Sequence, residues 1–188
     1  MTRRISALAA VVACASVCCA GVCAGPAGAS TAHSSKATQL CGNVSASSVS
    51  SIIGYKVPAG VGTTVSHKAT KQNDDVAFSV LNCTFGSDTS IASIKKSVSV
   101  SIETLSRSLS STELEQLVKK EQDIPGLHFK IVRYPSLGSE AYLTTFSEQG
   151  LNVESIAMES GTKVFGGTVD TSTPISKVVS LVKLAQKL

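Results

Sequence analysis

Polar and apolar residues alternate along much of the chain, and this alternation predicts β-strands. In the segment 97–105, Val98, Val100 and Ile102 occupy every second position and would face one side of a sheet. The segment 76–85 is rich in β-branched and aromatic residues, which favour strands. The two segments are predicted to pair as a hairpin.

A second group of strands follows in the C-terminal half. Alternation predicts a strand over 129–134, and the segments 141–146, 151–158 and 163–169 are predicted as three further strands. Short turns at 149–150 and 160–161 separate the last three, so they are predicted to form an antiparallel meander. Gly166 and Gly167 in the last strand indicate either a β-bulge or a close backbone approach by a ligand.

Helical spacing appears at both ends of the folded region. Ser45 would cap a short helix that Gly54 ends. Thr173 would cap the last helix, with Pro174 at its first position. The apolar face of this last helix recurs at helical spacing and should dock on the sheet.

The middle helix has two candidate starts. Overlapping capping boxes are offered by Ser110 with Glu113 and by Thr112 with Glu115. Both precede an apolar face, and both predict a helix before residue 125.

The order of elements is helix, two strands, helix, four strands and helix, without an alternating strand–helix–strand run. It predicts an α+β domain over residues 41–188, in which about three helices flank an antiparallel sheet. Residues 30–40 are small and polar and are expected to form a flexible tether. Residues 55–70, which contain Pro58 and three glycines, are expected to be a loop or an irregular edge strand.

The first 29 residues have the layout of an export signal. Two arginines precede an apolar run from Ile5 to about Val22, and the small residues 27–29 predict cleavage before Ser30. Removing these 29 residues from 188 leaves 159, which suits one domain. The mature protein is expected to be secreted or held at the outer face of the cell envelope.

Two modes of export remain open, ordinary secretion and lipid anchoring. Cys14 follows lipobox-like residues after a short apolar stretch, whereas Cys23 has the better length but the wrong preceding residue. No apolar run after residue 29 approaches the ~20 residues of a membrane-spanning helix. A membrane link is therefore expected only through a lipid anchor.

Cleavage would leave Cys41 and Cys83 as the cysteines of the mature chain. In an oxidising compartment they are predicted to form a disulfide. The alternative, a cysteine nucleophile, needs a partnering base. The candidate bases are His33 in the tether, His67 in a polar loop and His128 before a strand.

The remaining composition indicates no catalytic, cofactor or metal site. Taking Arg3 and Arg4 from 17 Lys and Arg leaves 15 against 13 Asp and Glu, too small an excess for a nucleic-acid partner. The histidines lack nearby ligands, and Asp74-Asp75 lacks a calcium-loop pattern. A Gly-x-Ser-x-Gly elbow is absent, and Ser139 is expected to serve a turn.

The layout resembles a known group. Cys41 opens a segment that ends at Ile53-Gly54, Cys83-Thr84-Phe85 follows, and Leu137-Gly138-Ser139-Glu140-Ala141-Tyr142 precedes a final apolar helix. This pattern resembles exported actinobacterial proteins, often lipoproteins, that carry a domain of unknown function. The resemblance implies a PsbP-like fold at the cell envelope and implies no reaction or catalytic residue.

Three functions follow as hypotheses. The first is a non-enzymatic envelope or secreted module that binds a partner protein or a small ligand through a sheet face or cleft. The second is a small secreted hydrolase, which needs a nucleophile beside a base. The third is a secreted inhibitor or effector. The sequence names neither the ligand nor the partner.

Overall fold

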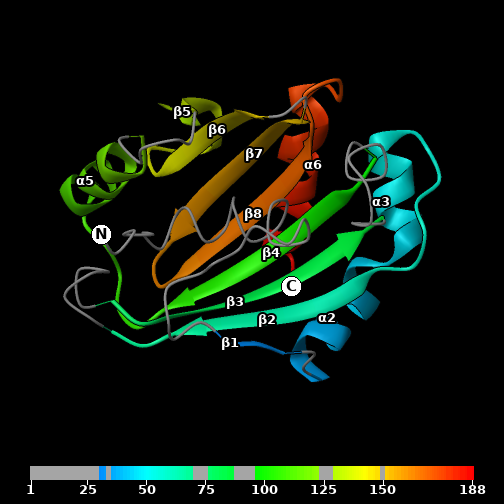
Figure 1. Cartoon of the computed structure of the whole chain (residues 1–188), viewed down its shortest axis with the longest axis horizontal. Helices are drawn as coiled ribbons and strands as arrows, with labels where there is room; N and C mark the ends of the chain where they lie inside the picture. Colours follow the sequence, from blue (N-terminus) through cyan, green and yellow to red (C-terminus); the bar gives the residue numbers. More distant parts are fainter. Residues whose placement is uncertain (1–29, 33–34, 70–75, 87–95, 123–128, 149–150) are drawn as a thin grey trace.

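The computed structural model describes residues 30–32, 35–69, 76–86, 96–122, 129–148 and 151–188. These residues contain an eight-stranded antiparallel sheet in the order β1-β2-β3-β4-β8-β7-β6-β5 (Figure 1). The strands are β1 (Ser30–Ala32), β2 (Val61–His67), β3 (Phe78–Phe85), β4 (Val98–Leu105), β5 (Phe129–Arg133), β6 (Ala141–Glu148), β7 (Leu151–Ser160) and β8 (Lys163–Asp170). The α-helices are α2 (Ser35–Val44), α3 (Ala46–Ile53), α5 (Ser111–Gln122) and α6 (Ile175–Gln186). The predicted α+β class is confirmed.

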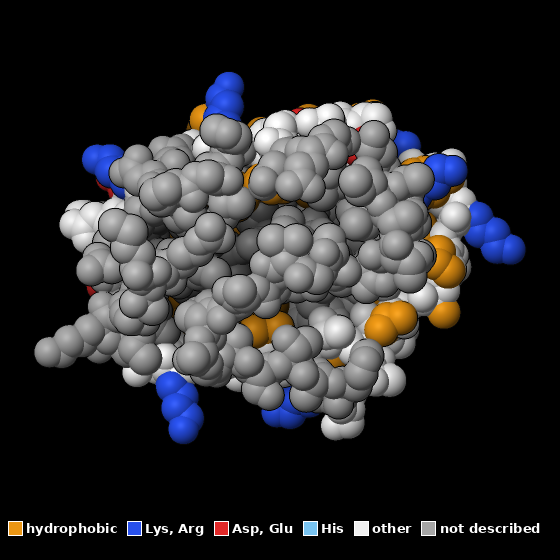
Figure 2. Space-filling model, viewed as in Figure 1, with side chains coloured by type: hydrophobic (Ala, Val, Ile, Leu, Met, Phe, Trp, Pro, Cys, Tyr) orange, Lys and Arg blue, Asp and Glu red, His pale blue; other side chains and the backbone are white. Residues whose placement is uncertain are grey.

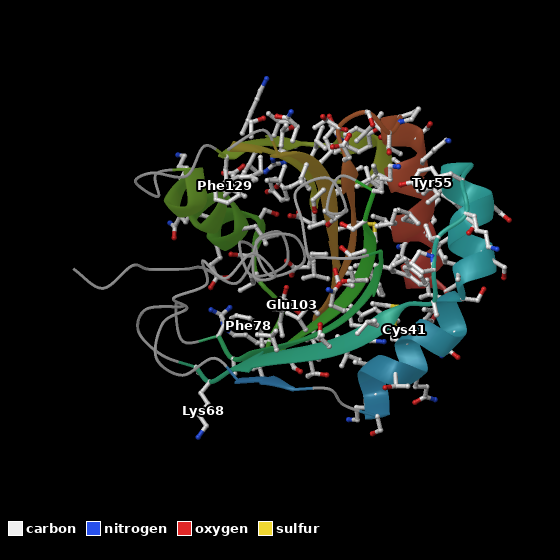
Figure 3. All side chains as sticks on the ribbon, turned by 45° about the vertical axis from the view of Figure 1, so that its right-hand side comes forward. Cys41, Tyr55, Lys68, Phe78, Glu103 and Phe129 are labelled. Atoms are coloured by element: carbon white, nitrogen blue, oxygen red, sulfur yellow. A yellow bond between two sulfur atoms is a disulfide. The ribbon has the colours of Figure 1, made fainter. Side chains whose placement is uncertain are left out.

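Helices lie on both sides of the sheet. Helices α2, α3 and α6 cover its outer face, where α6 packs on β8, β7 and β4 and α2 packs on β2 and β3 (Figures 1 and 3). Helix α5 lies on the inner face, against β5. The inner face is therefore covered by a described helix only toward its β5 edge. None of the described helices has the length and apolarity to cross a membrane.

The main core lies between the sheet and the outer helices. Its largest fully buried side chains include Phe85 on β3, Ile156 on β7 and Leu181 on α6. Val98, Val100 and Ile102 all face this core, as the alternation predicts. Burial of these side chains is the main favourable term that holds the helices on the sheet.

The predicted hairpin and meander are confirmed. Strands β3 and β4 pair antiparallel from Phe78 opposite Leu105 to Phe85 opposite Val98. Strands β6, β7 and β8 pair consecutively as expected, each one or two residues longer than predicted at its C-terminal end.

No bulge forms at Gly166 and Gly167, because pairing runs without a break from β8 to both of its neighbours. Gly167 instead lies under α6. A Cβ added there would lie 3.1 Å from Leu181 Cβ and 3.2 Å from the Val178 carbonyl oxygen. The missing side chain lets the helix approach the sheet closely. At Gly167 the close neighbour is therefore the chain's own helix.

The first predicted helix is confirmed as α3. The Ser45 side chain accepts a hydrogen bond from the Ser48 backbone N–H at 3.2 Å. Gly54 ends the helix in the left-handed conformation, at φ 85°. The predicted Thr173 cap is wrong by one residue: Pro174 is the N-cap of α6, and no side chain caps that helix. Pro174 has an extended ψ of 134°, so the helix begins after it.

Residues 30–40 are not an irregular tether. Ser30–Ala32 adds β1 to the sheet edge, and α2 begins at Ser35. Ala37 and Leu40 are buried, so packing on β2 and β3 stabilises this helix despite its polar composition. The segment 55–70 also differs from expectation, because β2 is an internal strand between β1 and β3.

The disulfide ties this region to the sheet. Cys41 on α2 and Cys83 on β3 are joined with an S–S distance of 2.08 Å and a Cα–Cα distance of 5.2 Å. Gly62 lies opposite Cys83 in the β2–β3 register, directly under α2. A Cβ added at Gly62 would lie 2.4 Å from the Ala37 carbonyl oxygen.

We therefore expect Gly62→Ala to lower the free energy of unfolding by about 2 kcal/mol, because the helix backbone must move. Gly42→Ala is the matched control, since nothing lies within 4 Å of a Cβ at this exposed site in α2. It should raise stability by about 0.5–1 kcal/mol through helix propensity. Urea unfolding measures both changes, and equal effects of the two variants would contradict the close approach of α2 to β2.

Candidate functional site

The inner face of the sheet carries a band of small polar side chains. Val98, Val100 and Ile102 point to the outer face, so Ser99, Ser101 and Glu103 point to the inner one. We call this band the polar strip. Its members are Asn82, Thr84, Ser99, Ser101, Glu103, Thr144, Ser155 and Thr168, and all except the half-buried Thr84 are buried.

Five hydroxyl side chains form one row of the polar strip. The strand registers place them side by side in the order Thr84, Ser99, Thr168, Ser155 and Thr144. The row crosses β3, β4, β8, β7 and β6. Within it, the Thr168 hydroxyl lies 3.3 Å from the Ser155 hydroxyl. Neighbouring hydroxyls can both donate and accept, so the row offers adaptable hydrogen bonding to a bound molecule.

The next row across the sheet contains mostly small residues. Asn82 lies opposite Ser101, followed by Gly166 and Ala157. The Asn82 amide nitrogen donates to the Thr84 hydroxyl at 3.0 Å. Its carbonyl oxygen Oδ1 is buried and has no hydrogen-bond partner among the described residues. The side chain is only 8% exposed, so this oxygen also lacks ready access to water.

Glu103 is the central charged residue of the strip. It projects from β4 to the inner side of the sheet (Figure 3) and is 1% exposed. Its cross-strand neighbours are Val80 and Val164. Within the described part of the chain, neither carboxyl oxygen has a hydrogen-bond partner. Burial, and then the charge of Glu159, raises the pKa of Glu103 well above its ordinary value.

Two further carboxyl groups, those of Glu159 and Glu140, lie between Glu103 and α5. Glu159 lies next to Val164 across the β7–β8 ladder, and one of its oxygens accepts from the Leu109 backbone N–H at 3.1 Å. Glu140 accepts from the Ser111 hydroxyl at 2.7 Å. The second oxygen of each carboxyl group is buried without a described partner. Burial is also the first cause that raises the pKa of Glu159.

Glu113 belongs to the helix start, not to the strip. It accepts from the Ser110 backbone N–H at 2.8 Å, while the Ser110 hydroxyl accepts from the Glu113 N–H at 3.3 Å. This confirms the first of the two predicted capping boxes. The hydrogen bond from Arg107 is the main cause that lowers the pKa of Glu113 to about 2.

Apolar clusters bound the polar strip on two sides. One contains Val76, Phe78, Val80, Leu105, Ala157 and Val164. The other contains Leu114, Val118, Ile131 and Tyr142 under α5. The Phe129 and Phe146 rings lie beside the second cluster with centroids 5.0 Å apart. A ligand on the strip would therefore meet polar groups in the middle and apolar groups at the sides.

Only some of the residues considered for chemistry from the sequence lie in the described part of the chain. Cys41 and Cys83 are joined, so neither is a free nucleophile. His33 and His128 lie outside the described residues, and His67 ends β2 with a side chain that is also outside them. Ser139 lies exposed on a turn, as expected. Asp74-Asp75 lies outside the described ranges, within which no group of three potential metal ligands occurs.

Sequence reasoning missed Asn82, Glu103 and Glu159. The signal for Glu103 was present, because Ser99, Ser101 and Glu103 alternate with the valines of β4. Such a polar register usually faces water. The burial of Glu103 could not be deduced from this pattern.

The described charges on the face shown in Figure 2 form no second candidate site. In Figure 2 the described Lys and Arg side chains are scattered around the rim of the visible face and do not gather into one patch. Comparison of the chain with family models, with curated proteins and with solved structures finds no match.

Proposed function

We propose that the protein is an exported, non-enzymatic module that binds a partner protein or a small molecule on the inner face of its sheet. The observation that carries this proposal is the polar strip with the adjoining Glu159, since Asn82, Glu103 and Glu159 have buried oxygens without a described partner. An unmet buried polar group costs about 1–3 kcal/mol. A bound molecule that supplies the missing donors would offset this cost.

Export is supported by two features. The first 29 residues have the layout of a signal, and the disulfide between Cys41 and Cys83 suits an oxidising compartment. We propose either free secretion or attachment at the outer face of the envelope through a lipid anchor. The resemblance to exported actinobacterial proteins points to the same location.

A binding role fits the strip better than hydrolysis does. A hydrolase needs a hydroxyl nucleophile within hydrogen-bond reach of a base. The side-chain hydrogen bonds found within the strip join Asn82 to Thr84 and Thr168 to Ser155. Neither bond activates a hydroxyl with a carboxylate or an imidazole. A fluorophosphonate probe that labelled a serine of the strip would favour the hydrolase instead.

Native mass spectrometry of the protein recovered from its native host tests the binding role. We expect the mass under native conditions to exceed the denatured mass by that of a noncovalent ligand. The double variant Ser101→Val/Thr168→Val, which removes two inner-face hydroxyls, should lose this excess. The control Thr145→Val/Ser147→Val makes the same type of change on the outer face of β6 and should keep it.

The denatured mass also reports the processing. It should start at Ser30 and increase on alkylation only after reduction. A native mass equal to the denatured mass, or an excess that survives Ser101→Val/Thr168→Val, would contradict binding on the inner face.

A further inference from the structure

The oxygens without partners share one chemical property. They are Asn82 Oδ1, Glu103 Oε1 and Oε2, Glu140 Oε2, Glu159 Oε2 and the Tyr142 hydroxyl. Except for the tyrosine, each is a carbonyl or carboxyl oxygen that accepts hydrogen bonds when the acids are ionised. The described part of this face therefore has a surplus of acceptors. Its complement is a group rich in N–H or O–H donors.

The sheet register sets the spacing of the two acids. Glu103 on β4 and Glu159 on β7 both lie opposite Val164 of β8, one from each side. Neighbouring strands are about 4.8 Å apart, so the two Cα atoms lie about 10 Å apart. A compact group above Val164 would lie within reach of both carboxyl groups. Asn82 lies on β3, diagonal to Glu103 on the same face.

Among the described residues, the charge that shifts the pKa of Glu103 is that of another acid. On β3 and β8 its cross-strand neighbours are valines, and the charge that acts on it is that of Glu159. Glu159 in turn is acted on by Glu140 and by Glu113 of α5. Like charges this close disfavour the joint ionisation of Glu103 and Glu159. A cation at their centre would relieve that repulsion.

We propose that the ligand of the inner face carries a compact cation, a primary ammonium or a guanidinium group, which is held above Val164 between Glu103 and Glu159. This inference rests on the proposed binding function and names the chemistry of its ligand. The apolar side chains of Val80 and Val164 would contact the carbon chain next to the cation. The hydroxyl row would contact the polar remainder of the ligand.

Binding of the cation is coupled to loss of a proton. In the free protein Glu103 holds its proton to a higher pH than an ordinary glutamate, because it is buried beside Glu159. The ammonium pairs with the carboxylate, and the carboxyl proton leaves to solvent. At pH values below the pKa of Glu103, the affinity for a cation should therefore increase with pH, by up to about tenfold per unit.

The test compares n-butylammonium with n-butanol, which has the same carbon chain without the charge. Titration calorimetry of the disulfide-bonded protein in two buffers of different ionisation enthalpy gives the affinity and the number of protons released. We expect n-butylammonium to bind at least about tenfold more tightly than n-butanol at pH 8. We also expect its binding to release a proton at those pH values where Glu103 of the free protein is protonated.

Glu103→Gln should abolish both the preference for the cation and the proton release. Glu154→Gln is the matched control, because Glu154 lies on β7 but faces the outer side, opposite Val169. It should leave both unchanged. Should Glu103→Gln fail to fold, Glu159→Gln replaces it, and it should weaken n-butylammonium binding several-fold while n-butanol binding stays the same.

Equal binding of the two probes, or a preference for the cation that survives Glu103→Gln, would overturn the inference. Neither result touches the proposed function, whose failure is detected separately as the absence of a ligand in the native mass. A ligand present in that mass together with equal probe binding would show a binding face for neutral molecules.

Discussion

Replacing Cys41 and Cys83 together with alanine is expected to lower the free energy of unfolding by about 4 kcal/mol. The bond closes a loop with a sequence separation of 42 residues. For a loop of this length, the loss of chain entropy in the unfolded state accounts for about 4 kcal/mol. Loss of the buried Cys83 sulfur from the main core adds a smaller packing cost.

The position of the disulfide makes this effect larger than that of a surface bridge. It joins α2 to β3, and α2 is a polar ten-residue helix, too short to be stable alone. Without the bond, α2 would be held by packing of Ala37, Leu40 and Val44. We therefore expect local loosening of α2 as well as a global loss of stability.

Urea unfolding of the double variant measures the total effect, and unfolding of the reduced wild-type protein is the control that keeps both sulfur atoms. Hydrogen exchange of α2 amides measures the local part. A decrease in the free energy of unfolding of less than about 1 kcal/mol in both proteins would show that the disulfide does not lower the conformational entropy of the unfolded chain as expected.

The C-terminal half could be predicted closely because its signals are local. The meander strands are bounded by short, turn-forming sequences at 149–150 and 160–161. The same holds for α3 in the N-terminal half, because the capping residues Ser45 and Gly54 predict both of its ends. In these segments the alternation and the turn or capping residues indicate the same element.

Strands β1 and β2 and helix α2 could not be predicted, because contacts far apart in sequence stabilise them. Helix α2 has few apolar residues, and its burial depends on a glycine of β2 that lets it approach. Strand β2 contains Gly62, which weakens the strand signal although it is needed under the helix. Here the residue that permits packing is the one that disfavours the local structure.

The polar strip was missed for a related reason. Alternation correctly separates the two faces of β4, but it does not say whether the polar face meets water. Only the strand order brings Thr84, Ser99, Thr168, Ser155 and Thr144 into one row, and these residues come from five strands spread over the chain. A site built across a sheet has no signature in a contiguous motif.

Glu103 is expected to destabilise the free protein, so Glu103→Met should raise the free energy of unfolding by about 3 kcal/mol at pH 7 to 8. Methionine has a similar shape, and it removes two carboxyl oxygens that lack partners in the described part of the fold. Glu154→Met on the outer face is the control, and it should change stability by less than about 0.5–1 kcal/mol.

The pH dependence gives this prediction its sign. The pKa of Glu103 is raised in the folded state, so folding favours the protonated form. The contribution of this raised pKa to the free energy of unfolding is complete below the pKa of the unfolded state, near 4.5. It is lost as the pH rises toward the pKa of the folded state. In that range the stability of the wild type should fall by up to about 1.4 kcal/mol per pH unit because of this group.

Urea unfolding of the wild type and Glu103→Met from pH 4.5 to 8 measures both effects, and the difference between the two proteins should widen with pH. A variant that is less stable than the wild type by more than about 1 kcal/mol would mean that Glu103 stabilises the fold. A more stable variant that has lost n-butylammonium binding would instead show that a costly buried acid serves recognition. Higher stability together with loss of binding is the behaviour expected of a binding residue that destabilises the ligand-free protein.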